Sequence, residues 1–228
     1  MKIETIEVAG FKPAFEAMRN PMNSHDRSDS HFHVPKLDDE EYVDVLGDAD
    51  VLLSYKLQTA GPEHCKHLRM IMAWADITAP RYWWQEADTY RIGVEKVSCS
   101  TMHKLMSRKL TEDDFEPTSE GLAKYRDASP NRDNDFLLQT IDRINYLIGK
   151  YNEEADPSVK RYYWEQVIQL LPQSYLQKRT VMFSYAALRN IVRQREGHKL
   201  GQWKVFIDWV RTLPYATQLI FDGEPGDR

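Results

Sequence analysis

Residues 69–77 constrain the fold of this chain more than any other segment. They read Arg-Met-Ile-Met-Ala-Trp-Ala-Asp-Ile, and both alternating faces of the run are mainly apolar. This pattern predicts a central strand that is buried on both sides. Ala79-Pro80 ends the run, and Pro80 is placed like a first helical residue, which predicts a short helix over residues 81–86.

The rest of the chain predicts few strands and several helices. Strand-like patterns lie at residues 2–8 and 180–183, and helical patterns at residues 12–18, 49–57, 185–194 and 203–210. The series Leu137, Ile141, Ile144 and Ile148 forms one helix face, and Asp156-Pro157 predicts the start of the next helix. This mixed order predicts an α+β fold, with a small antiparallel or mixed sheet and several long helices.

Two polar stretches interrupt this pattern. Residues 19–48 include the acidic run Asp38-Asp39-Glu40-Glu41, and residues 112–135 contain Pro117, Pro130 and several Asp and Asn. Both are predicted to be surface excursions from a single domain that spans residues 1–228. Long excursions of this kind are often functional or mobile.

Composition excludes several classes of protein. The 228 residues are 42% hydrophobic, which is enough for a buried core. A net charge of -5 argues against a dedicated nucleic-acid binder. The N-terminus does not resemble a signal peptide, and no run approaches the roughly 18 apolar residues of a membrane span. Two cysteines, Cys65 and Cys99, make neither a disulfide framework nor a zinc quartet, so we expect reduced thiols in a cytoplasmic protein.

Common catalytic motifs are absent from the sequence. The ten glycines are never spaced as a phosphate-binding loop, and neither GxSxG nor HExxH occurs. The pairs His31/His33 and His64/His67 are more typical of solvated loops than of a metal site. We therefore expect no metal.

Two segments are rich in side chains that can bind a ligand or take part in catalysis. Residues 80–104 are rich in aromatic rings, hydroxyls and mixed charges, which indicates either a polar surface or a binding cleft. Residues 184–195 form a predicted helix with three arginines, which alone could be an ordinary basic face. Asn190 and Arg195 are about 140° apart around a helix, so they share a face only if the helix ends near Arg195. Glu196-Gly197 makes that ending plausible.

The order and spacing of several short matches resemble the flavin-dependent thymidylate synthases over most of the chain. That family has an Ala-Pro turn, a helix with Arg-Gln, the motif RHRxxSxNExSxR, then Leu-Pro, NxRxLxNFxxLR and Ala-Gln-Trp-Glu-Ile. The matching residues are Ala79-Pro80, Gln85, Ser98, Leu171-Pro172, Leu188, Asn190, Arg195 and Gly201-Gln202-Trp203. The twelve-residue distance from Pro172 to Ser184 equals the family's distance to its NxR.

The departures concern the groups that hold phosphate and flavin in the family. Asp88-Thr89-Tyr90 replaces Arg-His-Arg, which grips the flavin. Lys96 replaces the Glu of the long motif, and Ser100 replaces its final Arg. Ala186 and Ile168 stand where the family has arginines. Arg91, Lys96, Lys104 and Arg179 are the cations that remain to replace these clamps.

The resemblance implies a function and a set of roles. Reduced FAD, methylenetetrahydrofolate and NADPH would convert a deoxyuridine nucleotide into its C5-methyl product. Arg195 and Ser98 would be catalytic, with Arg195 against a pyrimidine carbonyl. The cofactor-binding residues would be Asn190, Thr89, Tyr90 and Arg91, and the substrate-binding residues would be Gln85, Lys96, Ser98, Ser100 and Arg195. Tyr90 and Trp84 are candidates to stack on an aromatic cofactor. The family forms a homotetramer, so we expect one here.

Two alternatives remain open at this point. A related flavoenzyme could modify another pyrimidine nucleotide as a hydroxymethylase or methylase, which the changes at Lys96 and Ser100 favour. Alternatively, the chain is a non-catalytic interaction protein that keeps the fold. Flavin binding separates the last possibility from the two enzymes.

Overall fold

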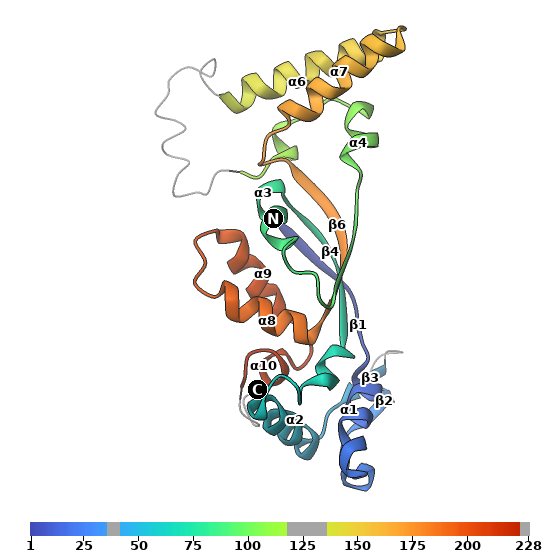
Figure 1. Cartoon of the computed structure of the whole chain (residues 1–228), viewed down its shortest axis with the longest axis vertical. Coiled ribbons are helices and arrows are strands. Elements are labelled where there is room, and N and C mark those ends of the chain that lie inside the picture. Colours follow the sequence, from blue (N-terminus) through green and yellow to red (C-terminus); the bar gives the residue numbers. More distant parts are fainter. Residues whose placement is uncertain (36–41, 118–135, 224–228) are drawn as a thin grey trace. The chain divides into compact units, whose positions relative to one another are not determined.

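A computed structural model describes residues 1–35, 42–117 and 136–223 of the chain (Figure 1). They fold into two compact units. The core unit comprises Ile3–Ile77, Asp88–Lys96 and Thr180–Arg228, and the hairpin unit comprises Met1–Lys2, Thr78–Ala87 and Val97–Arg179. No helix in the described ranges is long and apolar enough to cross a membrane.

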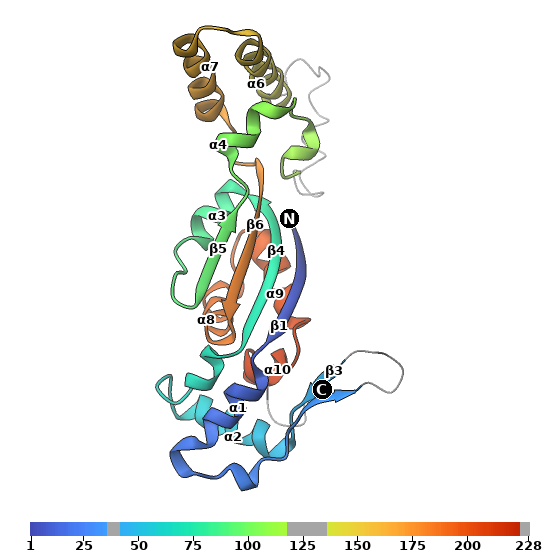
Figure 2. The same ribbon diagram turned by 90° about the vertical axis from the view of Figure 1, so that its right-hand side faces the viewer.

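A four-stranded sheet contains the segment that dominated the sequence. Its order is β1 (Lys2–Ala9), β4 (Met72–Pro80), β6 (Leu176–Ser184) and β5 (Val94–Ser98), with β4 inside the sheet as expected (Figure 2). Alternate residues of β4 are fully buried, and those between them are half-buried. The prediction for β4 is therefore correct in kind, although the strand begins at Met72 and runs on to Pro80.

The core unit also contains several helices. They are α1 (Phe11–Arg19), α2 (Asp48–Ala60), α8 (Tyr185–Arg195), α9 (Gly201–Arg211) and the short α10 (Ala216–Leu219). Figures 1 and 2 show α8 and α9 against one face of the sheet. Edge-to-face aromatic contacts join Phe183 of β6 to Phe206 of α9, and Phe206 to Trp203. Such ring pairs add stability beyond the area they bury.

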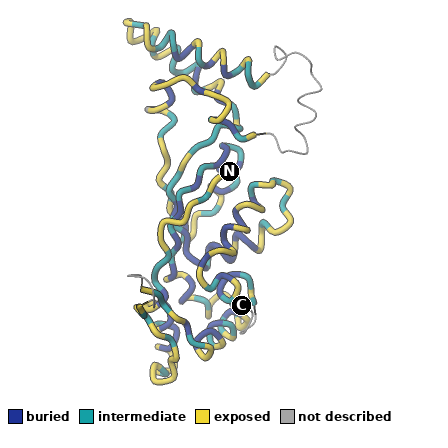
Figure 3. The backbone as a smooth tube through the Cα atoms, turned by 180° about the vertical axis from the view of Figure 1, so that it is seen from behind, coloured by how far each residue is buried: buried dark blue, intermediate teal, exposed yellow. Residues whose placement is uncertain are grey.

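A helical hairpin dominates the hairpin unit. The antiparallel pair consists of α6 (Phe136–Glu153) and α7 (Pro157–Leu170), and two short helices, α3 (Arg81–Ala87) and α4 (Thr101–Lys104), complete the unit's α-helices in its described part. The predicted face of α6 is buried at Ile141, Ile144 and Ile148, whereas the outer residues of both helices are exposed (Figure 3). Asp156 caps α7 as predicted, because its carboxylate accepts from Ser158 N at 2.7 Å.

These elements confirm the predicted α+β class and refine the polar excursions. Within residues 19–48 lies a two-stranded antiparallel hairpin of β2 (His31–Pro35) and β3 (Tyr42–Val45), which the sequence did not predict. The sequence also missed β5. Of the second excursion, residues 118–135 lie outside the described ranges. The assignment of residues 1–228 to a single domain stays a prediction.

A buried hydrogen-bond chain in the core unit includes His67. Gln58 Nε2 donates to Ser54 Oγ at 3.1 Å, and Ser54 Oγ lies 2.8 Å from His67 Nε2, to which its hydroxyl can donate. A ring nitrogen that accepts belongs to a neutral imidazole. Burial lowers the pKa of His67 to about 4, and the nearby Arg189 charge acts in the same direction.

We expect His67 to make the protein less stable in mild acid. The unfolded chain takes up a proton at His67 below its ordinary pKa of 6.5, whereas the folded chain resists protonation until about pH 4. The free energy of unfolding should therefore fall by about 3 kcal/mol between pH 6.5 and 4. Urea unfolding of wild type and His67→Gln at pH 7, 5.5 and 4.5 measures this, with the exposed His31→Gln as control. Equal pH slopes in wild type and His67→Gln would refute the assignment.

Candidate functional site

The segment 88–96 is attached to the start of α8. Ser184 N donates to Gly93 O at 2.8 Å, and the Ser184 hydroxyl caps α8 by accepting from Ala187 N at 3.2 Å. Gly93 has φ +70, and a Cβ there would lie 2.4 Å from Ser184 Oγ. Only glycine fits this close approach.

Arg195 lies in a cage at the other end of α8. Its Nε donates to Tyr90 Oη at 2.8 Å. Its guanidinium carbon lies 4.6 Å from the centre of the Trp203 ring and 5.4 Å from that of Tyr90. The cage exists because α8 ends at Arg195, as predicted, and Gly197 then adopts a positive φ of 72°. The guanidinium is thus oriented by the two rings and by its hydrogen bond to Tyr90.

The other two arginines of α8 have a different role. Arg189 is buried and bonded to Gln58 and Asp222, and Arg193 Nη2 pairs with Asp222 at 2.6 Å. Both cations are therefore used to anchor the segment after α10. The three arginines do not form a uniform basic face, and only Arg195 lies against the aromatic cage.

A directional chain of hydrogen bonds runs from Arg195 to Asn190. The Tyr90 hydroxyl accepts from Arg195 and so can donate only once, to Gln194 Oε1 at 3.1 Å. Gln194 Nε2 then donates to Asn190 Oδ1 at 2.9 Å. Asn190 is exposed, and within the described residues neither N–H group of its amide has a hydrogen-bond partner, so both can bind a ligand. Two predicted site residues, Arg195 and Asn190, are thus connected through Tyr90.

Residues 88–90 stand where the family has its flavin-binding Arg-His-Arg, and the one charge among them is balanced by Lys96. Lys96 Nζ lies 3.2 Å from Asp88 Oδ1 and donates to Tyr90 O at 3.2 Å. This lysine of β5 therefore holds the loop that precedes the strand. Arg91 is exposed, and its side chain has no hydrogen bond or ion pair within the described ranges. Thr89 is also exposed.

This donor set fits a flavin at its ring better than at its phosphates. Asn190 offers amide N–H groups to a heterocycle edge, and Arg91 offers one outward-facing cation. Asp88 places a carboxylate where the family has an arginine, and Lys96 neutralises it. These residues therefore still fit the flavin ring, but they would bind its phosphates more weakly.

The remaining predicted residues belong to the hairpin unit. Gln85 is exposed on α3 and donates to Gln173 Oε1 at 3.2 Å. Ser98 is exposed at the last position of β5, and Ser100 is half-buried before α4. The structure describes this unit by itself, so the roles of these three residues stay predictions.

Trp84 does not present its ring to a cofactor. Its side chain is 1% exposed, its Nε1 donates to Gln177 O at 2.9 Å, and the Arg179 guanidinium covers the ring at 4.2 Å. The prediction that Trp84 stacks on a cofactor is therefore wrong, because α3 turns this ring into the core. The Tyr90 ring meets Trp203 edge-on, and its hydroxyl accepts a hydrogen bond from Arg195, so Tyr90 positions the arginine.

Sequence reasoning missed Trp203 and Gln194 as parts of the site. Trp203 was noted only as part of a motif match, although a tryptophan eight positions after an arginine at a helix end is a candidate cation–π partner. Gln194 had no signal of its own, since its role depends on Tyr90. Within the described residues, no cluster of three His, Cys, Asp or Glu side chains is placed to hold a metal ion.

Comparisons with known proteins place this geometry in a known fold. No family model and no curated protein matches the chain. Two solved structures of the flavin-dependent thymidylate synthase ThyX from Helicobacter pylori, with FAD and dUMP, match it over nearly its full length. One is 18% identical with a TM-score of 0.64, covering 97% of both chains. The other is 17% identical with a TM-score of 0.65, covering 98% of this chain and 100% of that one. This chain therefore has the fold of the flavin-dependent thymidylate synthases.

Proposed function

We propose that the chain is an FAD-dependent, thymidylate synthase-like enzyme that transfers a one-carbon unit from methylenetetrahydrofolate to C5 of a deoxyuridine nucleotide. The observation that carries the proposal is the hydrogen-bond chain from Arg195 through Tyr90 and Gln194 to Asn190. It orients Arg195 and Asn190, and the fold of the chain is similar to that of solved structures that contain FAD and dUMP.

Arg195 is the residue assigned to the pyrimidine. Its Nε is bonded to Tyr90, and we assign the N–H groups at the far end of the guanidinium to a carbonyl oxygen of the base. When C5 becomes nucleophilic, negative charge develops on that oxygen, and a fixed guanidinium stabilises it. The rings of Trp203 and Tyr90 prevent the guanidinium from turning away. C5 loses its proton as the new carbon–carbon bond forms.

The cofactor contacts follow from the same chain. Bound reduced flavin would supply the hydride that completes the methyl group. Asn190 is assigned to the heterocycle edge, Thr89 and Tyr90 to the wall beside it, and Arg91 to phosphate. Ser98, proposed as catalytic, is assigned with Gln85, Lys96 and Ser100 to the nucleotide. The proposal also includes NADPH as reductant, a homotetramer and a cytoplasmic location.

Tritium release from C5-labelled dUMP tests the proposal. Purified protein with FAD, NADPH and methylenetetrahydrofolate should release tritium, and omission of any one component should stop it. FAD binding is measured in parallel from its absorbance and fluorescence. If tens of micromolar FAD do not bind and no tritium is released, the non-catalytic alternative replaces this proposal.

A second candidate substrate is favoured by Lys96. In the family a glutamate stands there, whereas this lysine pairs with Asp88 and bonds the backbone of Tyr90. A changed charge beside the cage favours a changed pyrimidine, as in a hydroxymethylase or methylase. Labelled dCMP run beside dUMP decides: a larger kcat/KM for dCMP selects this candidate.

Tyr90→Phe should lower kcat/KM of the preferred nucleotide about tenfold. The ring remains against Trp203, but Arg195 and Gln194 each lose their shared hydroxyl partner, and a lost hydrogen bond of this kind costs on the order of 1 kcal/mol or more. Steady-state kinetics with the exposed Tyr162→Phe of α7 as control measure this. Unchanged kinetics in Tyr90→Phe would show that the hydroxyl does not position Arg195.

A further inference from the structure

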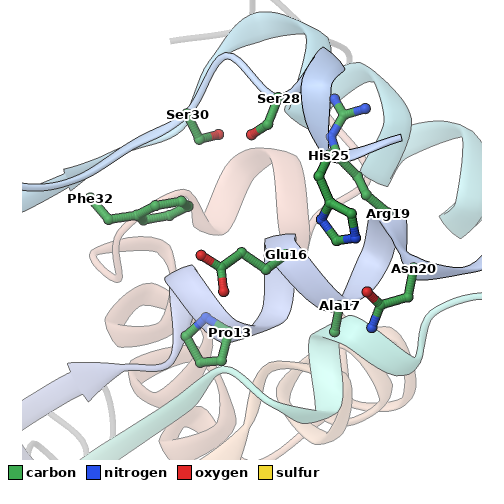
Figure 4. Close-up of a pocket in the computed structure, with 9 residues that line it drawn as sticks. All are labelled: Pro13, Glu16, Ala17, Arg19, Asn20, His25, Ser28, Ser30 and Phe32. Atoms are coloured by element: carbon green, nitrogen blue, oxygen red, sulfur yellow. The ribbon is translucent and has the colours of Figure 1, made fainter. Parts of the chain in front are cut away.

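A cavity of about 500 Å³ lies in the core unit between α1, the 3₁₀ turn His25–Arg27 and β2 (Figure 4). Its size suits a small organic ligand. None of its lining residues belongs to the motifs that carry the proposed function. A second hollow of about 770 Å³ shares Glu16, Ser30 and Phe32 with it, so there is also room for an elongated molecule.

One wall of this Glu16 cavity is a closed polar cluster. Asp50 is fully buried and accepts from Arg19 Nε, Ser28 Oγ and Ser30 Oγ, each at 2.6 Å. Ser30 Oγ in turn accepts from Gly47 N at 3.0 Å. Arg19 therefore gives its charge to Asp50 and has none left for an anionic ligand. The wall is rigid, because every member is held by another.

The open side of the cavity carries three polar side chains that this cluster does not use. Figure 4 shows the Glu16 carboxylate between Phe32 and Pro13, with His25 and Asn20 on the opposite side. Within the described ranges, none of these three side chains has a hydrogen-bond or ion-pair partner. Lys12, one helical turn before Glu16, lines the second hollow and forms no ion pair with it.

We propose that the Glu16 cavity binds a small organic amine, in which a protonated amino group is carried on a flat apolar body. The ammonium group meets the uncompensated Glu16 carboxylate in a charge-assisted hydrogen bond. The Phe32 ring is half-buried and faces the same space, so it takes the apolar body and attracts the cation through its π face. Asn20 and His25 accept the remaining N–H groups of the amine.

The charge arrangement selects this ligand class over others. Arg19 is the one lysine or arginine among the residues that line the Glu16 cavity, and it is neutralised by Asp50, so an anion inside this cavity would face the Glu16 carboxylate. A metal ion would need further ligands, and no cluster of three candidate ligands occurs in the described part of the chain. A neutral body of the same shape would leave the Glu16 carboxylate without a partner.

Phenethylamine is the probe, titrated into ¹⁵N-labelled protein and followed by two-dimensional NMR. We expect saturable shifts that concentrate on the amides of α1 and β2. Glu16→Gln should weaken binding about tenfold or more, since it removes a charge-assisted contact. Phe32→Leu should weaken it several-fold. Glu7→Gln, which removes an exposed carboxylate of β1 outside the cavity, should bind like wild type.

The neutral analogue 2-phenylethanol distinguishes charge recognition from apolar contact, and it should bind at least tenfold more weakly than the amine. Near-UV circular dichroism of each variant checks the fold; Glu16 is exposed, so its substitution leaves the core intact. The proposal is overturned if wild type shows no saturable shifts, if Glu16→Gln binds as wild type does, or if Glu7→Gln weakens binding equally. None of these outcomes bears on the pyrimidine site.

Discussion

Replacing Arg195 by alanine is expected to lower kcat/KM for the nucleotide about 100-fold or more, with the fold intact. A fixed donor aimed at charge that develops during the reaction is worth two to three orders of magnitude in rate. Arg195 is only half-buried, and Trp203 keeps its contact with Phe206 when the guanidinium is removed. Tritium release gives the rate, and near-UV circular dichroism verifies the fold.

Two arginine variants make this test specific. Arg193→Ala removes the same charge from the same helix, but Arg193 pairs with Asp222 outside the cage, so its activity should stay near wild type. Arg195→Lys keeps the charge and loses the planar fork, and we expect most of the activity to be lost. Binding of dUMP by calorimetry is a second readout. If Arg195→Ala keeps more than half of the activity, the assignment of α8 to the site is wrong.

The sequence predicted the end of α8 because the signals there are local. Ser184 caps the first turn and Gly197 accommodates the positive φ that follows the last one. The position of Arg195 on a helix end, and its proximity to the face of Asn190, follow from those two residues. The same holds for Asp156 at the start of α7 and for the apolar series of α6.

Contacts between distant segments could not be predicted in this way. Tyr90 and Arg195 are 105 positions apart, and their hydrogen bond depends on Gly93 meeting Ser184 at the other end of α8. Trp84 and Tyr90 are both aromatic residues of one dense segment, yet one ring enters the core and the other bonds the arginine. β5 was missed because its sequence, Val-Glu-Lys-Val-Ser, does not alternate between apolar and polar residues.

The missed hairpin β2–β3 has a related cause. Its two strands are only five and four residues long, and the segment before it is held by the buried Asp50 of α2. Ser28 and Ser30 looked like ordinary loop residues, since one sequence does not reveal which carboxylate they will bond. Residues 28 and 30 are therefore fixed to α2 by an acidic residue some twenty positions further along the chain.

Asp50→Asn is expected to lower the free energy of unfolding by about 3–5 kcal/mol at pH 7, which is the cost of breaking a buried ion pair by removing one partner. Arg19 is 5% exposed, and without the carboxylate its charge stays buried and uncompensated. Burial raises the pKa of Asp50, but the hydrogen bonds from Ser28 and Ser30 and the charge of Arg19 outweigh burial, so the pKa lies below its ordinary value of 3.8. The stabilisation is therefore complete above that value and is lost as the pH falls through the folded pKa.

Urea unfolding at pH 7 measures this loss, with Asp48→Asn as the matched control, because Asp48 is exposed in the first turn of the same helix. The double variant Arg19→Met with Asp50→Leu should recover much of the stability, since an apolar pair leaves no buried charge unpaired. If the free energy of unfolding of Asp50→Asn lies within 1 kcal/mol of that of wild type, the Arg19 guanidinium must be solvated by water in the variant. The wall of the Glu16 cavity is then less rigid than its hydrogen bonds imply. Phenethylamine binding by Asp50→Asn links the two results: a rigid wall predicts weaker binding in this variant, even though Asp50 itself does not line the cavity.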